Sequence, residues 1–70
     1  MNMIDGNRLR TLRLAMDKTV DQVGDVIGLS GSQVRHIENG LKTTSANTLK
    51  RLADYYGVTV DSLFKDSNTA

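Results

Sequence analysis

Apolar residues recur at intervals of three and four positions along almost the whole chain, whereas runs that alternate between apolar and polar residues are scarce. Intervals of three and four place side chains on one side of an α-helix, and strict alternation would place them on one face of a β-strand. The sequence also contains no proline, a residue that interrupts helices. The pattern therefore predicts a chain built only of short amphipathic helices.

The first helix is expected over residues 6–16. Leu9, Leu12 and Met16 fall on one stripe of this segment, so we expect them to face the core. Asp5 stands directly before the helix, and aspartate is favoured at a helix N-cap because its carboxylate accepts a hydrogen bond from a backbone amide.

Two shorter helices follow, and each begins with the residue pair of a capping box. Thr19 and Gln22 start the second helix, which ends at Gly28. Ser30 and Gln33 start the third. The apolar residues of this region that we expect to face the core are Val23, Val26, Ile27, Leu29, Val34 and Ile37.

The segment Gly28-Leu29-Ser30 joins these two helices and is short enough for a tight turn, where glycine tolerates a positive φ. Gly24 lies one helical turn earlier and leaves room for the two helices to cross closely. Together with the apolar register, these glycines indicate a helix-turn-helix unit rather than an ordinary helical hairpin.

Asn39 and Gly40 are expected to end the third helix, and residues 41–45 are polar and loop-like. A fourth amphipathic helix ends at Gly57, and Thr59 can cap a last short turn. The apolar residues of these last two elements are Leu49, Leu52, Ala53, Tyr56, Val60, Leu63 and Phe64.

The chain has 70 residues, which is near the lower size limit for a single domain without disulfides or metal sites. We expect the domain to cover residues 6–64. An N-terminal extension over residues 1–5 precedes it, and a flexible tail over residues 65–70 follows it.

Composition narrows the class of protein further. Cysteine is absent, which excludes disulfides and thiolate zinc sites and favours a cytoplasmic location. No apolar run approaches the roughly 18 residues of a membrane span, so we expect no membrane partner. With one histidine and no cysteine, we expect no catalytic residue, no metal and no cofactor. The formal net charge of +1 neither requires nor excludes nucleic acid.

The chain carries several short motifs that are more specific than its helical pattern: Leu9-Arg10-Thr11-Leu12-Arg13, Gly28-Leu29-Ser30, Ile37-Glu38-Asn39-Gly40, Leu49-Lys50-Arg51-Leu52-Ala53 and Gly57-Val58-Thr59-Val60-Asp61. From Gly6 to Phe64 it resembles the Cro and phage-repressor family, also called the XRE family. That resemblance implies an all-α, five-helix lambda-repressor-like fold and a sequence-specific DNA-binding transcriptional regulator of a phage or mobile-element switch. It also implies an ion pair between Arg13 and Glu38.

In this family the start of the third helix enters the major groove of an operator in double-stranded DNA. Arg35 is our first candidate for reading a base, because a guanidinium can donate two parallel hydrogen bonds to guanine. The residues expected to contact DNA or a partner are Thr19, Ser30, Gly31, Ser32, Gln33, Arg35, His36, Asn39, Lys42, Thr43 and Thr44.

The chain departs from the family pattern on this same surface. Val20 stands where relatives carry a phosphate-binding glutamine, Gly31 leaves the head of the third helix without a side chain, and Lys42 is the only base in the following loop. A second interpretation is therefore a modulator or antirepressor that binds a partner repressor protein, and an antitoxin role is a third.

The resemblance also implies a homodimer formed by the last elements. The expected contacts are Tyr55, Val60, Leu63 and Phe64, and the alternative is that these residues only close the core. Asp21 and Asp25 are expected to face solvent.

Overall fold

The computed structural model describes residues 4–40 and 44–65. It contains α1 (Gly6–Ala15), α2 (Val20–Ile27), α3 (Gly31–Glu38) and α4 (Ala46–Tyr56), followed by the 3-10 turn η1 (Asp61–Leu63). Within these residues the only β-pairing is an isolated bridge between Ile4 and Phe64. The all-α prediction is confirmed. The count of five helices is not, because the fifth element is a single 3-10 turn.

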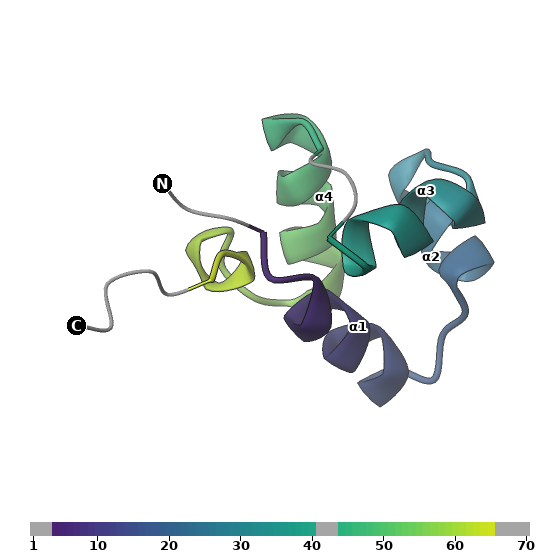
Figure 1. The fold of residues 1–70 in the computed structure, drawn as a ribbon, viewed down its shortest axis with the longest axis horizontal. Helices are drawn as coiled ribbons and strands as arrows, with labels where there is room; N and C mark the ends of the chain where they lie inside the picture. The colour runs from purple at the N-terminus through teal and green to yellow at the C-terminus, as the bar shows by residue number, and fades with distance from the viewer. Residues whose placement is uncertain (1–3, 41–43, 66–70) are drawn as a thin grey trace.

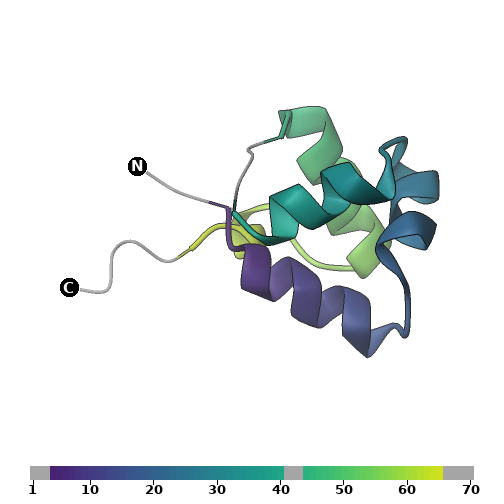
Figure 2. The same cartoon turned by 45° about the vertical axis from the view of Figure 1, so that its right-hand side comes forward.

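The closest packing between helices is that of α3 on α2, and α3 also contacts α1. Figures 1 and 2 show α2 and α3 side by side at one end of the molecule and η1 at the other end, next to the start of α1. The amide of Asp5 donates to the carbonyl oxygen of Leu63 at 2.7 Å, which fastens the start of α1 to η1. None of the described helices is long and apolar enough to cross a membrane.

Each α-helix begins at a polar cap. Asp5 accepts from the amide of Arg8, and both predicted capping boxes are present, Thr19 with Gln22 and Ser30 with Gln33. One further cap was not predicted: the Ser45 hydroxyl accepts from the Thr48 amide at 3.2 Å and starts α4. Its signal was a serine three residues before a second polar residue, directly ahead of the apolar stripe of α4.

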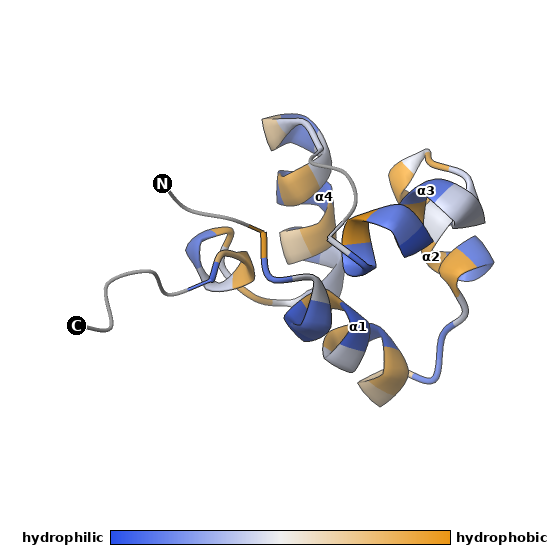
Figure 3. Cartoon of the chain, in the orientation of Figure 1, coloured by the Kyte–Doolittle hydropathy of each residue, from blue (hydrophilic) through white to orange (hydrophobic). Residues whose placement is uncertain are grey.

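All five elements contribute to one core. Figure 3 shows hydrophobic positions alternating with hydrophilic ones along the helices, as expected where each helix buries a single side. The buried apolar residues of the described chain are Leu9, Val23, Ile27, Val34, Ile37, Leu49, Leu52, Ala53 and Leu63.

Two residues predicted to face this core are exposed instead. Met16 is 40% exposed because α1 ends at Ala15 and leaves it beyond the last turn. Val26 is 55% exposed. The buried side of α2 includes Gly24, and at about 100° per residue Val26 falls on the opposite side from that glycine.

The turn between α2 and α3 depends on two glycines. Gly28 has a φ of 81°, a left-handed conformation that residues with a Cβ rarely adopt. The carbonyl oxygen of Gly24 accepts from the amides of Gly28 and Leu29 at 2.8 and 2.9 Å. A Cβ on Gly24 would overlap with the carbonyl oxygen of Leu29. The predicted close approach is therefore present, and it is made against the backbone of the turn.

We expect Gly24→Ala to lower the free energy of unfolding by about 1–3 kcal/mol, because backbone atoms must move to admit the new methyl group. The exposed neighbour provides the control: Asp25→Ala should change stability by less than about 0.5 kcal/mol. Urea titrations of both variants make the comparison. A more stable Gly24→Ala variant would mean that helix propensity outweighs the contact with the turn.

Candidate nucleic-acid interface

A buried ion pair holds α1 against the end of α3. Arg13 Nε donates to Glu38 Oε2 at 2.8 Å, and Arg13 Nη2 donates to Glu38 Oε1 at 3.0 Å. The side chains of Arg13 and Glu38 are 12% and 4% exposed. Arg13 Nη1 also donates to the carbonyl oxygen of Lys18 at 2.9 Å. One guanidinium therefore connects α1, the link to α2 and the last residue of α3.

Two neighbours complete the surroundings of this pair. A Cβ on Gly6 would overlap with the carbonyl oxygen of Glu38, so only glycine lets α1 begin this close to α3.

The hydrogen bond to Glu38 raises the pKa of Arg13. Burial, followed by the charge of Glu38, raises the pKa of Tyr56 to about 12. The phenol therefore stays neutral even above pH 10 and adds no second negative charge beside Glu38.

The head of α3 presents polar side chains at the surface. Ser30, Ser32 and Gln33 are exposed, as expected. The Ser30 hydroxyl accepts from the Gln33 amide at 3.2 Å, and Gln33 Oε1 accepts from the Ser30 amide at 2.9 Å. The capping box thus fixes the position of Gln33 at the start of the helix.

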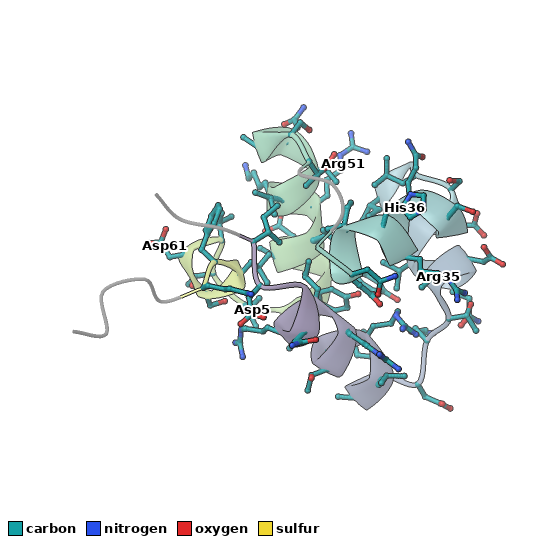
Figure 4. The ribbon with its side chains drawn as sticks, viewed as in Figure 1. Asp5, Arg35, His36, Arg51 and Asp61 are labelled. Carbon is teal, nitrogen blue, oxygen red and sulfur yellow. The ribbon has the colours of Figure 1, made fainter. Side chains whose placement is uncertain are left out.

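Arg35 and His36 lie further along α3 and differ in their surroundings. Arg35 is exposed, whereas His36 is half-buried. Figure 4 shows them on different sides of the helix, Arg35 towards α1 and the start of α2, and His36 towards Arg51 of α4. The two side chains therefore leave α3 in different directions.

Beside α3 lies an open groove of about 550 Å³ between the second half of α1, the link to α2, the start of α2 and the end of α3. It brings together three of the residues predicted to contact DNA or a partner, Thr19, Arg35 and Asn39. Arg10 and Lys18 also line it. Sequence reasoning missed these two because only the tertiary fold places them beside α3. The lining residues are Arg10, Arg13, Leu14, Asp17, Lys18, Thr19, Val20, Asp21, Arg35, Glu38 and Asn39.

Gly31, one of the residues expected to contact DNA or a partner, does not lie at the surface. Gly31 is buried against the start of α2, and a Cβ on it would overlap with the carboxylate of Asp21. Asp21 is exposed, as expected, but its carboxylate lies against the first residue of α3. Sequence reasoning gave no signal for this contact, since it depends on how closely the two helices cross.

The family model of the helix-turn-helix domain matches residues 6–63. The chain belongs to the helix-turn-helix domain family. It is 30% identical over 63 residues to a cryptic phage CTXphi transcriptional repressor, RstR of Vibrio cholerae, and the match covers 90% of this chain and 57% of the repressor. The chain therefore spans just over half the length of that relative.

Two solved structures have the same fold as this helix-turn-helix domain. A crystal structure of the P22 c2 repressor with a synthetic operator gives a TM-score of 0.82 at 20% identity, covering 87% of this chain and 92% of that one. The restriction-modification controller protein C.AhdI from Aeromonas hydrophila gives 0.77 at 30% identity, covering 84% and 89%.

The other residues predicted to contact DNA follow α3 in the chain of the helix-turn-helix domain. Lys42 and Thr43 lie outside the described residues, and Thr44 is half-buried just before α4.

Among the residues predicted for a dimer, Tyr55, Val60 and Phe64 are half-buried and pack against the core. Leu63 is 0% exposed and belongs to the core, as in the alternative that these residues only close the core.

We expect Arg13→Ala to lower the free energy of unfolding of the helix-turn-helix domain by about 3–5 kcal/mol, because Glu38 would be left buried without its partner. Arg8→Ala removes the same charge from an exposed position of α1 and should cost less than about 0.5 kcal/mol. Thermal unfolding of both variants decides the matter. Equal melting temperatures would contradict a structural role for the pair.

Proposed function

We propose that this chain is a sequence-specific DNA-binding transcriptional repressor of Cro type, acting in the switch of a phage or another mobile element. The observation that carries the proposal is the exposed, polar and capped head of α3, held on α2 by a tight glycine turn. Recognition helices of this class read base edges from that end. The similarity to RstR, a transcriptional repressor, supports the same function.

In the proposed complex, the head of α3 lies in the major groove of an operator. Ser32 and Gln33 face base edges from the first turn, and Arg35 donates to guanine further along. Thr19 and Asn39 contact phosphates from the groove beside α3, with Arg10 and Lys18 adding positive charge there. The fold shared with the P22 c2 repressor, whose structure contains a synthetic operator, supports this placement of α3.

The proposed repressor binds as a homodimer on a two-fold symmetric operator. Two recognition helices must then stand about 34 Å apart, one turn of the double helix. The half-buried Tyr55, Val60 and Phe64 are the candidate contacts between copies. Docking on a partner repressor instead of DNA is less well supported, because the relatives are repressors and controllers themselves.

The test is selection from a randomised pool of DNA duplexes, followed by affinity measurements on the selected sequence at low and moderate salt. Arg35→Ala should weaken binding about 5- to 150-fold, since it removes a base contact worth roughly 1–3 kcal/mol. Arg8→Ala, which changes the net charge equally on the exposed side of α1, should have a small effect. If the chain selects no sequence, or if both variants lose affinity equally, this placement of α3 is wrong.

A further inference from the structure

We infer that Asp21 of α2 discriminates between bases at the head of α3, in the place that a side chain at position 31 would otherwise occupy. This inference rests on the proposed function. It adds a specificity-determining residue that lies outside the recognition helix.

Position 31 and Asp21 compete for the same space. Gly31 is the first residue of α3 and is buried. A Cβ on it would overlap with Asp21 Oδ1 and would lie 2.9 Å from Asp21 Cγ. The backbone amide nitrogen of Asp21 would be only 3.3 Å away. The carboxylate therefore stands beside the first turn of α3, where the helix itself carries no side chain.

Asp21 lies in the first turn of α2 and against the first residue of α3, so two helix N-termini meet beside it. Each N-terminus carries a partial positive charge from its backbone amides. Asp21 is nevertheless exposed, which leaves its carboxylate accessible to a ligand that approaches the head of α3.

A carboxylate only accepts hydrogen bonds, and this limits which bases it can contact. In the major groove the donors are the amino groups of cytosine and adenine, whereas guanine offers two acceptors. Asp21 should therefore favour cytosine or adenine at the base that faces the start of α3. Its charge should also oppose nearby phosphates, so it gains selectivity at the expense of general affinity.

The experiment repeats the selection from randomised duplexes with the full chain and with Asp21→Ala. We expect the wild-type chain to select cytosine or adenine at one base pair by about five- to tenfold, and Asp21→Ala to lose that preference while keeping all others. The variant should also bind nonspecific DNA more tightly. Asp25→Ala removes an exposed acid from the next turn of α2 and should leave every base preference unchanged.

A double variant moves the contact onto the recognition helix. Asp21→Ala combined with Gly31→Ser places a hydroxyl on α3 in the vacated space, so the preference should change at the same base pair. Unchanged preferences in Asp21→Ala, or changes at a different base pair in the double variant, would overturn the inference and leave the proposed function intact. A wild-type chain that selects no sequence would overturn both.

Discussion

The buried pair between Arg13 and Glu38 determines where α3 lies in this molecule. The two hydrogen bonds join α1 to the last residue of α3, and Gly6 allows the start of α1 to approach the same residue. At the other end of α3, the turn at Gly24 and Gly28 fixes the helix on α2. A helix held at both ends keeps its exposed side chains in constant positions, which reading a base sequence requires.

Signals that act over three or four residues made most of the fold predictable. The capping boxes that begin at Thr19 and Ser30 specify where α2 and α3 start, and Gly28 specifies where α2 ends. Each of these signals involves residues only a few positions apart. The pair between Arg13 and Glu38 spans 25 positions, and only the resemblance to a family implied it. Spacing along the sequence alone could not identify Glu38 as the partner of Arg13.

What the sequence did not predict depends on how the helices cross. Val26 fits the apolar pattern of α2, yet α3 packs on the side that carries Gly24. The contact of Gly31 with Asp21 and the position of Arg10 in the groove have the same origin. The groove combines three bases outside the ion pair with Asp17 and Asp21. A surface of such mixed charge releases few counterions when it binds DNA, so base contacts must supply more of the affinity.

DNA binding through the head of α3 is tested by an amide chemical-shift map of the isotope-labelled chain with a duplex that it selects. We expect the largest changes at the start of α2 and along the first half of α3, with Arg35 and the groove residues Lys18 and Asn39 next to them. Changes confined to α4 and η1, with none at the head of α3, would contradict binding through this helix.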